Sequence, residues 1–162
     1  MINATMCFLK VNREILFLYR NKGDGDIHHG WYVPLGGKTE RGERGIDCIA
    51  REFEQDSTGL TLIAPKLRGI ATFYNQGRIL GGNENPEDWC VEVYEAREFR
   101  GKLKEEHPKA KPLWIKDSDL ESIKMYPGDR KILELLSQEG VFEVITQYDK
   151  ENLIRFESKR VA

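Results

Sequence analysis

One helical pattern, placed between segments that alternate like β-strands, constrains the fold of this chain most strongly. Residues 46–56 carry apolar side chains at helical spacing, which predicts one buried stripe made of Ile46, Ile49, Ala50 and Phe53. Gly59 is placed to end this helix. A helix with a single apolar stripe needs another layer to cover it, and the neighbouring strand-like segments are expected to supply that layer.

Strand-like alternation accounts for much of the remaining chain. The predicted strands cover residues 3–10, 14–20, 67–75, 89–99 and 112–115. The first two are expected to form a hairpin at Val11, Asn12 and Arg13. The tail, residues 141–158, predicts a second hairpin around residues 149–152.

Two further segments complete the predicted layout. The apolar run at residues 31–35 indicates a strand that Gly36 and Gly37 are expected to break. A second helix is predicted over residues 129–138, with Gly140 as its stop. The sequence therefore predicts an α+β fold in which a mixed central β-sheet is sandwiched between helices.

The composition predicts one domain spanning residues 1–162. Hydrophobic residues make up 40% of the chain and charged residues 32%, an ordinary balance for a globular protein. The net charge is −2, and no basic stripe is present, which argues against binding to duplex nucleic acid. We therefore expect a small-molecule ligand, and the sequence leaves the oligomeric state open.

The cysteines and the N-terminus bear on location. The three cysteines lie far apart without a Cys-x-x-Cys pair, so they are expected to be reduced thiols in the core. Lys10 and Arg13 interrupt the apolar residues near the N-terminus, which does not fit a signal peptide or a membrane span. These features predict a cytoplasmic protein that does not bind a membrane.

The most informative chemistry lies in the predicted first helix and just before it. Glu52 and Asp56 are four residues apart, so their carboxylates fall on one helix face, roughly 6 Å apart along the axis. Glu43 precedes the helix and can fold back toward that face. The backbone carbonyls of Gly36 and Gly37 can supply further hard oxygen ligands. Such a set suits Mg²⁺, which also keeps waters and substrate phosphates as ligands.

These residue types suit the hydrolysis of a pyrophosphate. The negative charge of a pyrophosphate must be neutralised before water can attack phosphorus, and metal ions do this. A metal ion also makes its bound water more acidic, so a nearby carboxylate can act as a general base. The planar guanidinium of Arg51 can hold the carboxylates in place or bind a phosphate.

The run from residue 37 to residue 60 resembles the Nudix box. That box consists of Gly, five residues, Glu, seven residues, Arg-Glu, an apolar residue, then acidic residues and a Gly-apolar pair. The matching residues here are Gly37, Glu43, Arg51, Glu52, Phe53, Gly59 and Leu60. The alternative for the same run is an exposed amphipathic helix with an acidic face.

The resemblance implies a Nudix fold and a pyrophosphohydrolase that depends on Mg²⁺ or Mn²⁺. It implies Glu52 as the central metal ligand or general base. The expected catalytic group is Glu52, Glu43 and Arg51, and the expected metal ligands are Gly36, Gly37, Glu52 and Asp56.

Outside the box, the chain resembles the MutT- and MutX-like 8-oxo-dGTP diphosphatases. The flanking motifs that carry this resemblance are residues 28–32, 88–89, 112–115 and 125–129. In that branch an aromatic residue stacks on the purine and an Asp hydrogen-bonds it, which implies these roles for Tyr126 and Asp129. Tyr32 is expected to line the same base site. The implied substrate is an oxidised purine nucleoside triphosphate such as 8-oxo-dGTP.

Several of these residues have simpler alternatives. Asp129 stands where a helix N-cap would stand, and an Asp there accepts backbone N–H bonds. Trp31 and Tyr32 fit core packing as well as a base site. His28 and His29 fit a solvated loop as well as a phosphate contact.

The chain departs from the family pattern at two places. Gln55 and Asp56 stand where the family has a Glu-Glu pair, and one residue is inserted near Ser57 and Thr58. Lys109 stands where relatives carry a metal-binding Glu, which Glu105 or Glu106 would have to replace. Two other functions therefore stay open: hydrolysis of ADP-ribose or a dinucleotide, and nucleotide binding by a catalytically impaired module.

Overall fold

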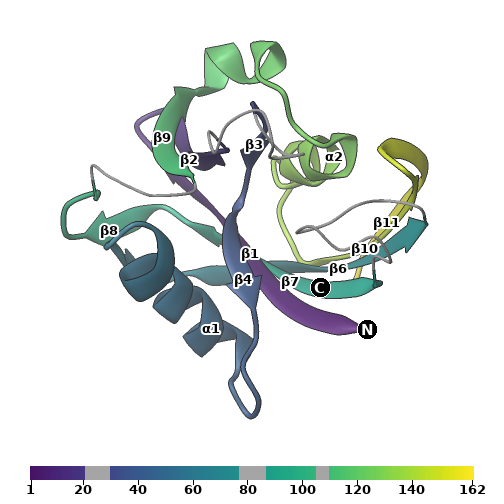
Figure 1. Ribbon diagram of the computed structural model, residues 1–162, viewed down its shortest axis with the longest axis horizontal. Helices are drawn as coiled ribbons and strands as arrows, with labels where there is room; N and C mark the ends of the chain where they lie inside the picture. The colour runs from purple at the N-terminus through teal and green to yellow at the C-terminus, as the bar shows by residue number, and fades with distance from the viewer. Residues whose placement is uncertain (21–29, 77–86, 105–109) are drawn as a thin grey trace.

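The computed structural model describes residues 1–20, 30–76, 87–104 and 110–162. The strands of its main sheet are β1 (Ile2–Val11), β2 (Glu14–Tyr19), β3 (Tyr32–Val33), β4 (Leu35–Lys38), β6 (Lys66–Gln76), β7 (Trp89–Ala96), β9 (Lys111–Lys116), β10 (Phe142–Asp149) and β11 (Asn152–Arg160). Within the described residues the order across this nine-stranded sheet is β11-β10-β6-β7-β1-β2-β3, with β4 paired to β1 and β9 paired to β2. Helices α1 (Gly45–Arg51) and α2 (Pro127–Leu135) lie on either side of the sheet (Figure 1).

The sheet is mixed, as predicted. Strand β1 runs parallel to β7, and β6 runs parallel to β10, whereas β6 and β7 are antiparallel. The β1–β2 hairpin is confirmed, with Val11 opposite Glu14. Asn12 and Arg13 turn the chain with φ values of 52° and 62°, and two successive positive φ values are typical of a type I′ turn. The tail hairpin is also confirmed, since β10 and β11 pair antiparallel.

The central strand β1 separates two layers of core. Side chains alternate between the faces of a strand. Accordingly, Ala4 and Phe8 pack in a cluster with α2, whereas Cys7 and Leu9 pack in a second cluster with α1. Phe53 is fully buried in the second cluster, and burial of such a side chain stabilises a fold by about 1.5–3 kcal/mol. The helices therefore cover both faces of the sheet.

The prediction that Gly36 and Gly37 break the strand is wrong, because both lie inside β4. A Cβ atom on Gly36 would lie 2.0 Å from the backbone oxygen of Thr5, and one on Gly37 would lie 2.2 Å from Oε1 of Glu52. The two glycines thus let β4 lie close to β1 on one side and to the helix on the other.

The first helix has two parts rather than one. Helix α1 ends at Arg51 and continues as a π-helix, η1 (Glu52–Ser57). The predicted buried stripe is partly wrong. Ile49 and Phe53 are fully buried, but Ile46 is 36% exposed and Cys48 takes a buried place instead. Ile46 lies in the first turn, before the part of the helix that the core covers.

Other boundaries differ from the sequence patterns. The predicted strand over residues 89–99 is divided, because β8 (Glu98–Arg100) turns away to pair with β5 (Thr61–Ile63) in a separate sheet. A 3-10 helix, η2 (Asp117–Ser122), was not predicted. Helix α2 begins two positions before its predicted start at residue 129, because Pro127 occupies its first turn.

Two further expectations concerned reduced cysteines in the core and the absence of a membrane span. All three cysteines are free, and Cys7 and Cys48 are buried, whereas Cys90 is half-buried. Burial raises the pKa of both buried thiols. In the described part of the chain, the helices are too short or too polar to cross a membrane.

Candidate active site

Arg51 is the centre of a group of carboxylates at the junction of α1 and η1. Its Nε and NH2 atoms donate to the two oxygens of Glu43 at 2.8 and 2.9 Å. Its NH1 atom donates to Asp56 at 2.7 Å and to Glu52 at 3.2 Å. A further bond from NH2 to the Lys38 carbonyl, at 3.2 Å, ties the guanidinium to β4. Three predicted acidic residues are thus brought together by one cation.

Glu43 serves this arrangement as a fixed anion. Besides the two bonds from Arg51, its carboxylate accepts the backbone N–H of Glu40 at 3.0 Å. The hydrogen bonds from Arg51 lower the pKa of Glu43 to about 2, and the Glu40 amide lowers it further in the same direction. In return, the hydrogen bond to Glu43 raises the pKa of Arg51. The pair is therefore fully charged at neutral pH.

Glu52 has the opposite electrostatic character. Its side chain is only 15% exposed and lies against the backbone of Gly37. Burial raises its pKa, and the negative charge of Asp56 raises it further, although Arg51 opposes both effects. A carboxylate with a raised pKa is a better proton acceptor than an ordinary one. Among the clustered acids, Glu52 is the one suited to take up a proton.

The structure places Asp56, and not Gln55, on the Arg51 side of the helix. Asp56 shares the NH1 atom of Arg51 with Glu52. Gln55 is exposed, and its backbone carbonyl accepts a bond from Lys104 Nζ at 3.3 Å. The placement of Asp56 beside Glu52 agrees with the position obtained by counting four residues from Glu52 along the helix.

The donor set fits a hard divalent cation in part. In the described residues no three His, Cys, Asp or Glu side chains form a group arranged to hold a metal ion. Glu52 and Asp56 do offer carboxylate oxygens from one face, and Mg²⁺ usually takes one or two carboxylates with waters and substrate phosphates. The carbonyl of Gly37 already accepts contacts from Thr5 Oγ1 at 3.5 Å and Cys48 Sγ at 3.6 Å.

A second group of predicted residues lies near the start of α2. The rings of Trp31 and Tyr126 are stacked with centroids 4.2 Å apart and an angle of 10° between their planes. Lys124 Nζ lies 4.3 Å from the centroid of the Trp31 ring. Both aromatic residues are buried. The two rings therefore pack against each other in the interior of the protein.

Asp129 is not the N-cap of α2. The N-cap is Tyr126, and Asp129 lies inside the first turn, where a negative charge is favourable near the positive end of the helix dipole. Asp129 is 8% exposed. The neighbouring Gly128 donates its N–H to the hydroxyl of Tyr148 at 2.8 Å, which fixes this turn to β10. Tyr32 is half-buried, and its ring lies 4.9 Å from that of Tyr19.

Sequence patterns missed the contacts of Cys48 with β4. Its thiol donates to the carbonyls of Gly37 and Lys38, both at 3.6 Å, and lies 3.3 Å from Thr5 Oγ1 on β1. The available signal was its position three residues before Arg51, on the buried face of the helix. The sequence candidates His28, His29, Glu105, Glu106 and Lys109 lie outside the described residues.

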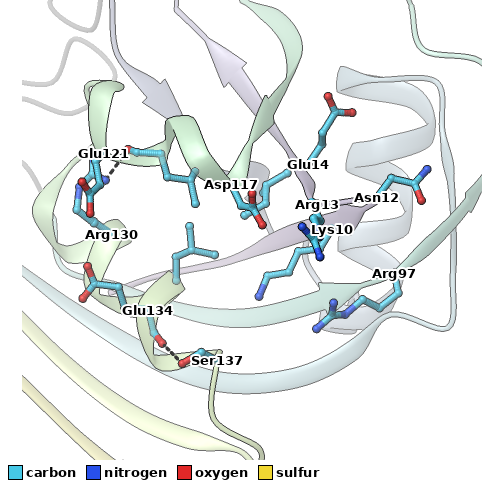
Figure 2. A pocket seen from close by; sticks show the side chains of 13 residues that line it. Lys10, Asn12, Arg13, Glu14, Arg97, Asp117, Glu121, Arg130, Glu134 and Ser137 are labelled. Atoms are coloured by element: carbon cyan, nitrogen blue, oxygen red, sulfur yellow. Dashed lines mark hydrogen bonds between the residues drawn. The ribbon is translucent and has the colours of Figure 1, made fainter.

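A cavity of about 480 Å³ lies elsewhere, between the β1–β2 turn, η2 and α2 (Figure 2). Its lining includes none of the predicted site residues. Acidic and basic side chains line it in equal number, and the Arg130 guanidinium among them is bound to the carbonyls of Leu120 and Ile123 at 2.7 and 2.8 Å. The cavity is therefore separate from the carboxylate group.

Comparisons with known proteins agree with this geometry. Residues 2–136 match the family model of the NUDIX domain. YvcI of Bacillus subtilis (strain 168), described as an uncharacterized Nudix hydrolase, is 30% identical over 133 residues, which are 82% of this chain and 77% of that protein.

The chain is similar in fold to many solved structures, including the following two. The MutT mutator protein of Bacillus halodurans has a TM-score of 0.81 at 24% identity, covering 98% of this chain and 97% of that one. The NUDIX domain of Shewanella oneidensis NrtR, solved with ADP ribose, has a TM-score of 0.64 at 12% identity, covering 85% and 86%.

Proposed function

Because this chain belongs to the NUDIX family and is a Nudix hydrolase of nucleoside diphosphate derivatives, we propose that it hydrolyses an oxidised purine nucleoside triphosphate such as 8-oxo-dGTP to the monophosphate and pyrophosphate. The observation that carries this proposal is the carboxylate group held by Arg51. The likeness in fold to a MutT protein supports the choice of a triphosphate.

Each residue of the carboxylate group has a distinct role in the proposed reaction. Water attacks one phosphorus of the bridge between the α- and β-phosphates, the bridging P–O bond breaks, and the group on the other phosphorus, pyrophosphate or the nucleoside monophosphate, leaves. Glu52 is the central metal ligand or the general base that accepts the proton of the water, and burial, which raises its pKa, suits it to the second role. Glu43 holds Arg51 by two hydrogen bonds, and Arg51 in turn fixes the positions of Glu52 and Asp56.

Glu52 and Asp56 would hold the divalent cation, together with a backbone carbonyl of Gly36 or Gly37. Mg²⁺ and Mn²⁺ both prefer carboxylate and carbonyl oxygens, which is the chemistry of this donor set. When bound, the cation neutralises the phosphate charge and acidifies the attacking water. Arg51 occupies the space between the carboxylates, so we expect the NH1 bonds to lengthen when metal and substrate bind.

The base would bind near the start of α2. Tyr126 is stacked on Trp31 there, and Tyr32 lies half-buried on β3. Asp129 would hydrogen-bond the purine edge. Its place in the buried first turn of α2, three residues after Tyr126, supports this role.

Two other functions use the same site. The NUDIX domain of NrtR was solved with ADP ribose, which supports a nucleoside diphosphate sugar as the alternative substrate. Gln55 in place of an acidic residue supports the other alternative, a nucleotide-binding module without turnover.

One experiment separates these functions. A panel of 8-oxo-dGTP, dGTP, ADP-ribose and a dinucleotide is incubated with Mg²⁺ or Mn²⁺, and the products are resolved by chromatography. Pyrophosphate and a monophosphate from 8-oxo-dGTP at the highest kcat/KM support the proposal. A sugar phosphate from ADP-ribose as the main product would replace it, and tight nucleotide binding without products would indicate a binding module.

We further propose that residues 1–162 form one hydrolase domain in the cytoplasm. Strands β10 and β11 lie beyond the matched residues 2–136 but pair into the same sheet through β6, which supports one domain. The three free cysteines support a reducing compartment. The net charge of −2 supports a small nucleotide over duplex nucleic acid as ligand.

A further inference from the structure

The widened helical turn η1 begins at the proposed base, Glu52. A π-helix forms i→i+5 hydrogen bonds and is often the result of one residue inserted in an α-helix. The sequence contains such an insertion, since Gly59 lies one position later than the Nudix box spacing places it. The additional residue is therefore taken up as a wider turn within Glu52–Ser57.

Two hydroxyl groups hold this turn. Ser57 Oγ donates to the carbonyl of Glu52 at 2.7 Å, and Thr58 Oγ1 donates to the carbonyl of Phe53 at 2.8 Å. Thr58 Oγ1 also accepts the N–H of Leu60 at 3.1 Å. The N–H groups of Thr58 and Gly59 both reach the Phe53 carbonyl, at 3.1 and 2.8 Å. Thr58 is fully buried and Ser57 nearly so.

The width of the turn decides which side chain lies beside Glu52. In an α-helix, at about 100° per residue, the third and fourth residues after Glu52 lie on either side of its direction. A π-turn rotates by a smaller angle per residue, because more residues complete each turn. Gln55 is then carried away from the Glu52 direction, while Asp56 stays close to it. The hydrogen bond from Arg51 to Asp56 agrees with this geometry.

We propose that the hydroxyls of Ser57 and Thr58 are positioning groups, which hold the π-turn so that Asp56 alone joins Glu52 as the second carboxylate of the cation site. This rests on the proposed function, in which Glu52 and Asp56 bind a divalent cation. The insertion thus compensates for Gln55: the residue that lacks a carboxylate is turned away, and the aspartate is kept in place.

Direct titration with Mn²⁺, followed by electron paramagnetic resonance of the free ion, tests this without turnover. Thr58→Val keeps the volume of the side chain but removes both hydroxyl bonds, so the Kd for Mn²⁺ should rise about 10-fold, the lower end of what outer partners of metal ligands contribute. Thr58→Ser keeps the hydroxyl and should retain the parental Kd, even though its lost methyl group lowers the melting temperature.

Ser57→Ala should also raise the Kd, whereas Ser137→Ala is the matched control. Ser137 makes the same kind of bond, from its Oγ to the carbonyl of Glu134 at 2.8 Å, at the end of α2. The proposal is overturned if Thr58→Val and Thr58→Ser change the Kd equally, or if Ser57→Ala behaves like Ser137→Ala.

A cycle of two changes tests the turn itself. Deletion of Ser57 restores the box spacing and should convert the π-turn to an α-helical one. Gln55→Glu should leave the Kd for Mn²⁺ unchanged in the parent and lower it several-fold in the deletion variant. Equal effects in both backgrounds would overturn the proposal. If none of these variants changes the Kd for Mn²⁺ but the protein still hydrolyses its substrate, the proposed function holds and the positioning role of Ser57 and Thr58 is wrong. Absence of Mn²⁺ binding by the parent overturns this proposal, and the release of pyrophosphate from the nucleotide panel then tests the proposed function separately.

Discussion

Arg51 and Glu43 form a two-bonded ion pair, with 2.8 Å from Nε to Oε2 and 2.9 Å from NH2 to Oε1. Two parallel bonds of this kind fix the orientation of a guanidinium, which a single contact does not. The NH1 atom, left free by this pairing, is thereby directed at Glu52 and Asp56. The ion pair therefore determines how the other two carboxylates are arranged.

Glu43→Gln should lower stability at neutral pH. The folded pKa of Glu43, about 2, lies below its usual value of 4.5, so its contribution is present above 4.5 and is lost as the pH falls through about 2. Urea denaturation should show a lower midpoint for the variant at pH 7 and a narrowing gap as the pH decreases. Glu40→Gln is the control, because Glu40 Oε1 lies 3.8 Å from Nε of Arg51 and is well exposed. A difference in urea midpoint that does not depend on pH would contradict the role of Glu43 as an ionised partner of Arg51.

Glu52→Gln should raise the melting temperature of the metal-free protein at pH 7. The pKa of Glu52 is raised in the folded state, so the stability that its protonated form contributes is present below about 4.5 and is lost as the pH rises through the folded pKa. A neutral amide avoids that loss. The variant should therefore have the higher melting temperature at pH 7, and the two melting temperatures should become equal near pH 4. A variant that melts earlier than the parent at pH 7 would show that the contact with Arg51 outweighs burial.

Asp56→Asn should raise the metal concentration needed for half-maximal activity, while Gln55→Ala should change it much less. The reason is that Asp56 accepts a hydrogen bond from Arg51 NH1 beside Glu52, whereas the contact of Gln55 is made by its backbone carbonyl with Lys104. Activity is measured across a range of Mg²⁺ concentrations for both variants. Equal sensitivity at the two positions would mean that Gln55 faces the cation in the active state.

Asp129→Ala should raise KM and reduce discrimination between an oxidised and a normal purine. Loss of a buried hydrogen-bonding partner is worth about 1–3 kcal/mol in binding. Because Asp129 is in the first turn of α2 and is not its N-cap, stability should fall by only about 0.3–1 kcal/mol. Kinetics with 8-oxo-dGTP and dGTP, together with thermal melts, check both effects. If the variant melts earlier yet keeps the parental KM values and substrate ranking, Asp129 is structural only.

Much of the fold could be predicted because alternation and helical spacing are local properties. The β1–β2 hairpin follows from them, and the turn at Asn12 and Arg13 has the expected position. The place of Gly36 and Gly37 within β4 could not be predicted in this way. It depends on how closely Thr5 and Glu52 approach from other elements.

In the candidate site, too, local spacing could be predicted from the sequence, whereas contacts between distant elements could not. The spacing of Glu43, Arg51 and Glu52 indicated one group of residues, and the structure brings them together. The π-turn was visible in the sequence only as an inserted residue, since helix type depends on the hydrogen bonds that Thr58 makes. The stacking of Trp31 on Tyr126 joins residues far apart in the chain, which no periodicity reports.

The release of pyrophosphate by the parent and by Glu52→Gln tests the central claim most directly. Both proteins are incubated with 8-oxo-dGTP and saturating Mg²⁺, and kcat is measured after thermal melts have shown that both are folded. Loss of a general base alone lowers a rate by about 10²–10⁴, so we expect kcat to fall at least 100-fold. A kcat within a few-fold of the parent would contradict the role of Glu52 in the carboxylate group held by Arg51.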